Sequence, residues 1–151
     1  MDLRTDTDFF DLLSASFVRL MKHSLVPMGL ERSEAANWLY ESAPFGILAH
    51  NTADDPMFVY GNIAAQRLFE YDWNELVSLP SRLSAEQPAR DERQRFLEEV
   101  QRNGFVSGYR GIRVSKTGRR FEILDATVWQ LIDDNGQYHG QAAMLPQTKR
   151  I

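Results

Sequence analysis

Three extended runs near the end of the sequence, separated by two short turns, constrain the fold most. The runs cover residues 105–115, 120–132 and 138–145, and each is long enough to form a strand. Residues 116–118 and 133–136 separate them, and the second turn contains an Asn-Gly pair, which is typical of a tight β-hairpin. Hairpin turns join antiparallel neighbours. This part of the chain is therefore predicted to form a three-stranded antiparallel meander.

A second hairpin is predicted earlier in the chain. Residues 45–50 and 57–60 are rich in apolar residues, and residues 51–56 between them include Asn, Asp and Pro, which favour a turn. Short helical patterns follow this hairpin. Asn62 can cap the first of them, and Asp72 begins a capping-box pattern ahead of the second. Two strands and then two short helices are expected in this region.

Longer helical patterns occur at two places. In residues 9–23, apolar side chains recur at three- and four-residue spacing, and Asp8 can cap the helix. A short helix follows before an Ala-Pro pair interrupts the pattern. Residues 89–102 are predicted to form a helix whose inner face includes Phe96, and Gly104 ends it.

The order of these elements predicts an α+β fold in one domain. A chain of 151 residues suits a single hydrophobic core. The two early and three late strands can form one five-stranded antiparallel sheet, with the short helices on one face. On this division, residues 1–43 are an N-terminal helical flank, residues 44–146 are the core, and residues 147–151 are a C-terminal tail.

The amino-acid composition excludes several function classes. The chain has no cysteine, so disulfides, thiolate nucleophiles, cysteine metal ligands and chromophores that need a thiol adduct are excluded. The net charge of −4 disfavours direct binding to DNA or RNA. No apolar stretch is long enough to span a membrane, and residues 1–8 do not form an export signal. A cytoplasmic location without membrane attachment is expected.

The sequence offers no clear catalytic or metal-binding pattern. His23, His50 and His139 are far apart, so no pair of them has the spacing that a metal site usually uses. The sequence also lacks a Gly-x-Ser-x-Gly elbow and a glycine-rich phosphate loop. Adjacent carboxylates fall on a predicted helix surface and a hairpin tip, where solvation explains them. We therefore predict that the protein is not an enzyme and has no metal and no cofactor.

Several short segments resemble the MEKHLA family, whose domains are similar to PAS domains. The resemblance covers about residues 10–145. The string Met-Glu-Lys-His-Leu-Ala, which gives the family its name, is absent from this chain. That absence puts in doubt any role specific to the plant members. The matching segments are Ala43-Pro44-Phe45, Tyr60-Gly61-Asn62, Leu79-Pro80-Ser81-Arg82-Leu83, Tyr109-Arg110-Gly111-Ile112-Arg113, Gly118-Arg119-Arg120-Phe121, Ala126-Thr127-Val128-Trp129 and Gly140-Gln141-Ala142-Ala143.

The resemblance implies a PAS-like five-stranded antiparallel sheet that often encloses a cavity beneath its helices. MEKHLA domains occur alone in bacteria or at the C-terminus of plant homeodomain-leucine zipper regulators, where a sensory or dimerisation-modulating role is inferred. No catalytic activity accompanies the family. Haem-binding PAS domains commonly take an axial histidine from the long helix, and residues 89–102 contain none. The resemblance therefore favours a stand-alone sensory domain without haem.

Seven side chains are candidates for a ligand-binding cavity on the PAS-like interpretation. Residues two positions apart in a strand share one face of the sheet. Arg113 and Gln141 could fix an anionic or amide-bearing ligand. The alternative is that the aromatic members only fill the core and that Asn62 only caps a helix. The full set is Tyr60, Asn62, Tyr109, Arg113, Thr127, Trp129 and Gln141.

The first predicted helix suggests an association surface. Its apolar stripe includes Phe9, Phe10, Leu13, Phe17 and Leu20, and is wider than one small sheet face needs. A homodimer through this helix is the expectation. The alternative is that the helix packs on the sheet of its own chain.

The leading hypothesis is a sensory or regulatory domain that binds a small ligand or a protein partner. With no output domain on this chain, it would signal through dimerisation or through an unknown signalling protein. A small-molecule enzyme could instead use Arg113, Tyr109 or His50, and it would have a buried titratable pair with a shifted pKa in its pocket. A purely structural dimerisation domain would have a filled core and no cavity.

Overall fold

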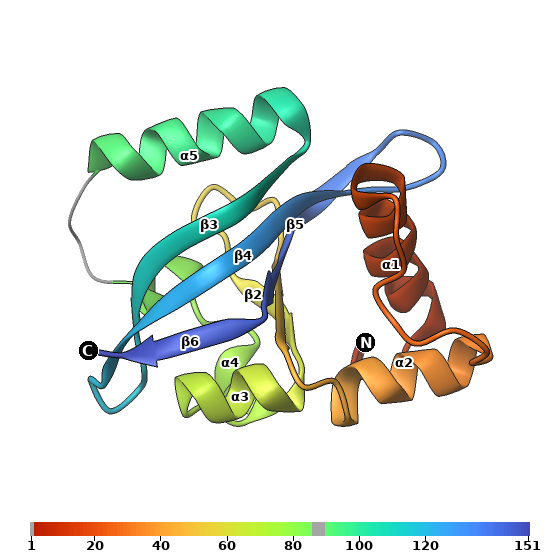
Figure 1. Ribbon diagram of the computed structural model, residues 1–151, viewed down its shortest axis with the longest axis horizontal. Helices are drawn as coiled ribbons and strands as arrows, with labels where there is room; N and C mark the ends of the chain where they lie inside the picture. Colours follow the sequence, from red (N-terminus) through yellow and green to blue (C-terminus); the bar gives the residue numbers. More distant parts are fainter. Residues whose placement is uncertain (1, 86–89) are drawn as a thin grey trace.

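The computed structural model describes residues 2–85 and 90–151, and a single antiparallel sheet organises them (Figure 1). The sheet order is β2-β1-β5-β4-β3, and β6 also pairs with β4. The predicted α+β class is confirmed. Residue 89, where the sequence places the start of the long helix, lies outside the described residues. The elements are α1 (Thr7–Met21), α2 (Arg32–Glu41), β1 (Gly46–His50), β2 (Phe58–Gly61), α3 (Ile63–Phe69), α4 (Trp73–Leu76), the 3₁₀ helix η1 (Ser81–Ser84), α5 (Arg90–Asn103), β3 (Phe105–Val114), β4 (Arg120–Ile132), β5 (Tyr138–Leu145) and β6 (Gln147–Arg150).

The predicted hairpin and the predicted meander are both present in the sheet. β1 pairs with β2, and β3, β4 and β5 form the antiparallel meander. The hairpin and the meander join where β1 pairs with β5, with Leu48 opposite Ala143. This pairing places the start and the end of the core side by side in the middle of the sheet.

The sheet has a sixth strand where the sequence analysis expected a C-terminal tail. β5 and β6 pair with β4 in one continuous register, from Thr127 opposite Met144 to Leu124 opposite Gln147. Pro146 separates the two strands, because proline has no N–H to donate to the ladder. β6 therefore continues the edge of β5 along β4.

The helices cover both faces of the sheet. Trp129 of β4 packs in one cluster with Phe17 of α1, and α2 contributes to the same cluster. Phe121 of the same strand packs with Phe69 of α3 on the other face, where α4 and α5 also contribute buried residues. The predicted layer of short helices on one face is therefore present, and the N-terminal helices cover the opposite face.

Local capping explains where the helices begin. Asn62 caps α3 by accepting a hydrogen bond from the Ala65 N–H, and Asp72 forms the predicted capping box at α4. The predicted cap of α1 is corrected. Asp6, whose backbone is extended, accepts from the Phe9 N–H at 2.8 Å, and Asp8 lies inside the first turn.

The turn between β3 and β4 is held against the end of α3. The Glu70 carboxylate accepts hydrogen bonds from the hydroxyls of Ser115 and Thr117, and Lys116 pairs with Glu75. The two hydroxyl donors lower the pKa of Glu70 below its ordinary value of 4.5. Hydrogen bonding to the charged form has this effect because it stabilises the carboxylate over the neutral acid.

Replacing Glu70 with glutamine is expected to lower the melting temperature at neutral pH and to have a smaller effect in acid. A carboxylate with a lowered folded-state pKa stabilises the protein above the unfolded-state pKa, which is about 4.3 for glutamate. This contribution is lost as the pH falls through the folded-state pKa. Thermal unfolding of both proteins across this pH range measures the effect. Glu99→Gln, at an exposed position of α5, is the control. If the difference in melting temperature between Glu70→Gln and wild type does not become smaller in acid, the prediction is contradicted.

Candidate ligand-binding site

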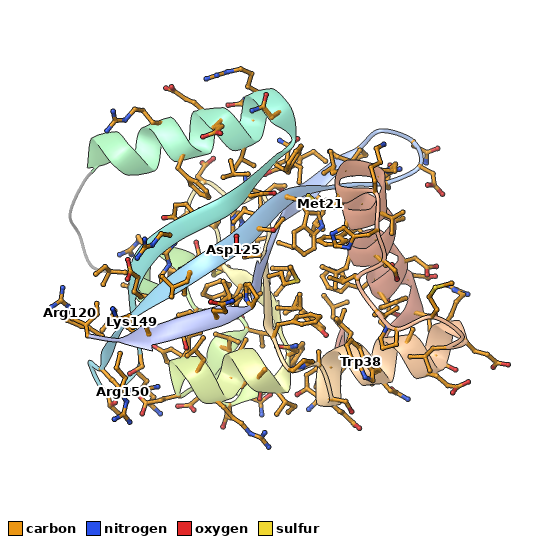
Figure 2. The ribbon with its side chains drawn as sticks, viewed as in Figure 1. Met21, Trp38, Arg120, Asp125, Lys149 and Arg150 are labelled. Atoms are coloured by element: carbon orange, nitrogen blue, oxygen red, sulfur yellow. The ribbon has the colours of Figure 1, made fainter. Side chains whose placement is uncertain are left out.

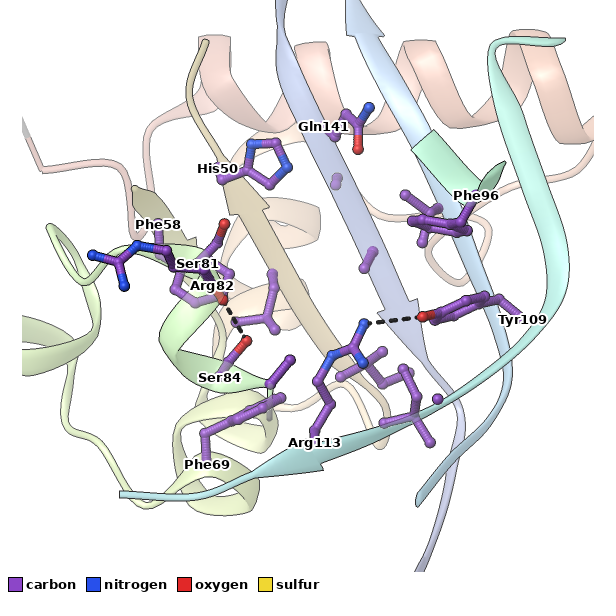
Figure 3. Close-up of a pocket in the computed structure, with 18 of the residues that line it drawn as sticks. His50, Phe58, Phe69, Ser81, Arg82, Ser84, Phe96, Tyr109, Arg113 and Gln141 are labelled. Carbon is purple, nitrogen blue, oxygen red and sulfur yellow. Dashed lines mark hydrogen bonds between the residues drawn. The ribbon is translucent and has the colours of Figure 1, made fainter. Parts of the chain in front are cut away.

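A cavity of about 440 Å³ lies between the sheet and the helices α3, η1 and α5 (Figure 3). Its lining includes residues from the five strands β1 to β5 and from these three helices. Cavities that hold small molecules usually measure about 300–1,000 Å³. The core on this face is therefore not completely filled, and the space is large enough for a ligand.

Most of the cavity wall is apolar or aromatic. Ala143 and Leu145 alternate along β5 and line the cavity, and Val128 lies on the adjacent strand β4. Phe69 closes the wall from α3, and Phe96 from α5. Such a wall suits the hydrocarbon or aromatic part of a ligand.

Tyr109 and Arg113, both on β3, meet at one side of the cavity (Figure 3). Arg113 Nη2 donates a hydrogen bond to the Tyr109 hydroxyl at 3.4 Å, and its guanidinium carbon lies 5.6 Å from the centre of the Tyr109 ring. Arg113 Nη1 donates to the Ile112 carbonyl oxygen at 2.9 Å. The Phe96 ring lies 4.3 Å from the Tyr109 ring. These contacts fix the guanidinium at the cavity wall.

Gly111 leaves the space in which Tyr109 and Arg113 meet. A Cβ atom at position 111 would lie 2.8 Å from the Tyr109 hydroxyl oxygen and 3.0 Å from Arg113 Nη1. Both distances are shorter than ordinary contacts of a Cβ atom, so any larger residue would push the two side chains apart. Gly111 therefore leaves room for the guanidinium to approach the phenol.

Arg113 differs from the other arginines of the lining in its charge balance. Arg82 pairs with Asp55 at 3.2 Å, and Arg110 pairs with Glu122 at 3.3 Å. No carboxylate among the described residues forms an ion pair with Arg113, whose hydrogen bonds go to a phenol and a carbonyl. The cavity therefore has one cation whose charge the surrounding protein does not balance, within the described part of the chain.

Polar groups also lie on the β1 and β5 side of the cavity. Gln141 of β5 is 9% exposed and is the register partner of His50 of β1. Figure 3 draws both side chains at the cavity, away from Arg113. His50 Nδ1 lies 2.9 Å from the Asn51 carbonyl oxygen. A ligand that spans the cavity could contact Arg113 at one end and Gln141 at the other.

Thr127 and Trp129 face α1 and not the cavity, which corrects their predicted place. Trp129 is fully buried, its ring centre lies 5.0 Å from that of Phe17, and its Nε1–H donates to the Leu13 carbonyl oxygen at 3.3 Å. Thr127 shares this face because it is two residues away on β4. Val128, between the two, lines the cavity.

Tyr60 is also placed away from the cavity. Its ring lies 5.4 Å from Phe9 of α1, 6.2 Å from Tyr40 of α2 and 5.8 Å from Trp73 of α4. Burial raises the pKa of Tyr60 well above its ordinary value, because the charged phenolate would lose its hydration. The alternative that this tyrosine fills the core matches its position.

Asn62 uses its whole side-chain amide inside the protein. Its Nδ2 group donates to the carbonyl oxygens of Leu39 and Phe45, both at 3.0 Å. Its Oδ1 atom accepts from the N–H groups of Ile47 at 2.9 Å and Ala65 at 3.0 Å. No donor or acceptor remains for a ligand. Of the seven predicted site residues, the structure thus brings together Tyr109, Arg113 and Gln141 at the cavity.

The predicted set did not include the aromatic residues that the helices contribute. Phe96 and Phe69 both line the cavity, from α5 and α3. The helical periodicity of residues 89–102 already placed Phe96 on an inner face, so that pattern could have identified it. For Phe69 the sequence contained no signal that separates the cavity wall from the rest of the core.

The apolar stripe of α1 packs on the sheet of its own chain. Phe10, Leu13 and Phe17 are 8%, 1% and 0% exposed, and Phe9 and Leu20 are half-buried. These residues pack against buried residues of the same chain, as in the alternative that the helix packs on its own sheet, and a homodimer through this helix stays a prediction. The docking is also polar. The Ser16 hydroxyl accepts from the Ile132 N–H and donates to the Ile132 carbonyl oxygen, both at 3.0 Å.

A model of the MEKHLA domain family matches residues 7–150 of this chain. The chain belongs to the MEKHLA family. The resemblance found in the short segments is thereby confirmed. A search of curated proteins found no match. None of the helices in the described part of this MEKHLA domain has the length and hydrophobicity that a membrane span requires.

Solved structures of PAS and light-oxygen-voltage domains are similar to this MEKHLA domain. A PAS domain from Colwellia psychrerythraea is 15% identical with a TM-score of 0.59, covering 74% of this chain and 90% of that chain. An RNA-binding light-oxygen-voltage receptor is 21% identical with a TM-score of 0.64, covering 82% of this chain and 34% of that chain. The light-state dimer of the fungal blue-light photoreceptor Vivid is 15% identical with a TM-score of 0.58, covering 86% and 90%. At these identities the likeness establishes the PAS-like fold.

Proposed function

We propose that this MEKHLA domain is a sensory domain that binds a small molecule in the cavity beside Tyr109, Arg113 and Gln141. The observation that carries the proposal is the cavity itself, which combines an apolar wall with a few polar groups from β3 and β5. This combination is the usual form of a small-molecule site. The PAS-like fold and the family membership support a sensory or regulatory role.

Ligand binding would be transmitted through β4 to α1. Val128 of β4 lines the cavity, and its neighbour Trp129 packs against α1 on the opposite face. Ser16 and Arg19 of α1 both hydrogen-bond to the Ile132 carbonyl oxygen at the end of the same strand. A shift of β4 on ligand binding would therefore change how α1 packs. The altered α1 surface would then change dimerisation or the docking of a signalling protein.

Dimerisation stays part of the proposal. Vivid, a neighbour in fold, forms a light-state dimer. In this MEKHLA domain, the most buried members of the α1 stripe contact their own sheet. A dimer that uses them would require α1 to move, which is the change that we propose ligand binding controls.

The two alternative functions are less well supported. A purely structural domain with a filled core does not account for the cavity. An enzyme would be expected to place a buried group with a shifted pKa at the cavity. The buried tyrosine with a raised pKa, Tyr60, lies among α1, α2 and α4 and does not line it.

Native mass spectrometry of the purified protein, recorded beside its absorption spectrum, tests the proposed function. Purification without heat or denaturant keeps a bound molecule in place. A retained small molecule of defined mass is the expected result, and the same spectrum reports the oligomeric state. A chain that stays bare and does not bind any member of a metabolite library would contradict the proposal. Visible absorption would contradict the predicted absence of a flavin or haem cofactor.

A further inference from the structure

We infer that the cavity selects small molecules that carry an anionic group, such as a carboxylate or sulfonate, on an aromatic body. This inference deepens the proposed function and rests on it. It follows from three features of the described cavity: a cation without a carboxylate partner, a glycine that leaves room for it, and an aromatic wall beside it.

Arg113 supplies the anion-binding group. A half-buried cation that has no carboxylate partner among the described residues is costly, because no counter-charge there replaces the hydration that it loses. Its bonds to Tyr109 and Ile112 use only some of its N–H donors. A guanidinium presents parallel N–H groups that match the oxygens of a carboxylate or a similar oxyanion. A bound anion would therefore complete both the charge and the hydrogen bonding of Arg113.

The guanidinium is held where a ligand in the cavity can reach it. Figure 3 shows the Arg113 side chain rising from β3 toward the Tyr109 hydroxyl, inside the ring of lining residues. Gly111 permits this approach, since a Cβ atom there would contact both side chains. The other two lining arginines are occupied by Asp55 and Glu122. The geometry therefore favours a single anionic group on the ligand.

The aromatic preference comes from the side chains next to Arg113. The rings of Phe96 and Tyr109 lie 4.3 Å apart at an interplanar angle of 34°, and both line the cavity. Phe69 lines it from α3. Aromatic rings favour offset or edge contacts with another ring, which add to the effect of burying apolar area. A planar ligand body that extends from Arg113 along these rings would make such contacts.

Two fluorescent probes that share the same aromatic rings test the anionic preference and the aromatic preference separately. Anilinonaphthalene sulfonate carries one anionic group, and phenylnaphthylamine has the same aromatic rings without it. Fluorescence titration of the full chain gives a dissociation constant for each probe. Wild-type protein is expected to bind the sulfonate about tenfold or more tightly than the neutral probe, because a hydrogen bond to a charged group contributes more than a neutral contact.

Variants locate the effect in the cavity. Arg113→Gln is expected to weaken sulfonate binding by about tenfold and to leave the neutral probe unchanged. Arg113→Lys keeps the charge but loses the forked donors, so it is expected to fall between wild type and Arg113→Gln. Arg67→Gln, at an exposed position of α3 outside the cavity, is the matched control and should bind both probes as wild type does. Ala143→Phe fills the cavity floor and should weaken both probes.

The outcomes distinguish the inference from the proposed function. If both probes bind and Arg113→Gln affects neither, or both equally, the anionic preference is overturned while the cavity remains a ligand site. If neither probe binds, or if Ala143→Phe leaves the binding of both unchanged, the proposed cavity function is overturned as well. Circular dichroism of each variant establishes that it is folded. If Arg113→Gln does not fold, Arg113→Lys replaces it in the test. Weaker binding of the sulfonate probe with unchanged binding of the neutral probe then supports the inference, and unchanged binding of both probes overturns it.

Discussion

Replacement of Asn62 with alanine is expected to reduce the free energy of unfolding by about 3–5 kcal/mol. The substitution removes four hydrogen bonds and leaves two carbonyl oxygens and two N–H groups without their partner. Each buried group that loses its partner costs about 1–3 kcal/mol, although some can be partly rehydrated. Urea unfolding followed by circular dichroism measures the change.

Two control variants separate this network from simple helix capping. Asn62→Asp keeps an oxygen that can cap α3 but loses both donors and places a carboxylate beside the carbonyl oxygens of Leu39 and Phe45. It is expected to be at least as unstable as Asn62→Ala. Asn37→Ala, at an exposed position of α2, should change stability by no more than about 0.5 kcal/mol. Near wild-type stability of Asn62→Asp would mean that Asn62 acts only as a cap.

Replacement of Trp129 with alanine is expected to cost about 3–5 kcal/mol of unfolding free energy and to loosen α1 from the sheet. Trp129 is fully buried, packs edge-on against Phe17 and donates to the Leu13 carbonyl oxygen. Removing a large buried aromatic side chain leaves a cavity that the surrounding structure fills only partly. Chemical unfolding gives the stability, and hydrogen exchange of the α1 amide groups reports how firmly the helix is docked.

The matched control for Trp129 is Trp38, which is half-buried on α2. The centre of the Trp38 ring lies 6.0 Å from that of the Phe45 ring, and part of the Trp38 surface is exposed to water. Trp38→Ala should therefore cost less than Trp129→Ala and leave α1 exchange nearly unchanged. Equal costs for the two variants, or unchanged α1 protection in Trp129→Ala, would contradict the role of Trp129 in docking the helix. Figure 2 labels Trp38 on α2.

Turns and caps were predictable from sequence because their chemistry acts within a few residues. The Asn-Gly turn joins β4 to β5, and the capping box at Asp72 forms as expected. Asn62 also makes hydrogen bonds that local sequence patterns do not predict. Its cap on Ala65 lies within one turn of helix, whereas its bonds to Leu39, Phe45 and Ile47 join segments that only the folded chain brings together.

The candidate site was predicted only in part, because sequence spacing shows which residues of a strand share a face but not which face lines the cavity. Tyr109 and Arg113 were expected on one side of their strand, and they meet at the cavity. Thr127 and Trp129 also share a side, but it faces α1. A shift of one residue in register reverses every side chain of a strand. The register of β4 against β3 shifts twice near Tyr109, and the sequence does not encode such a shift in a recognisable pattern.

The sequence determined the order of the α-helices and of the first five strands, the hairpins, most of the caps and the family, since all of these follow from local periodicity or short segments. Tertiary structure decided the rest. Pairing with β4 made the expected tail a strand, packing on Trp129 placed α1 on its own sheet, and the approach of α3 and α5 to the sheet left the cavity beside Arg113. Each of these depends on contacts between residues far apart in the chain, where the position of one element is set by the shape and register of another.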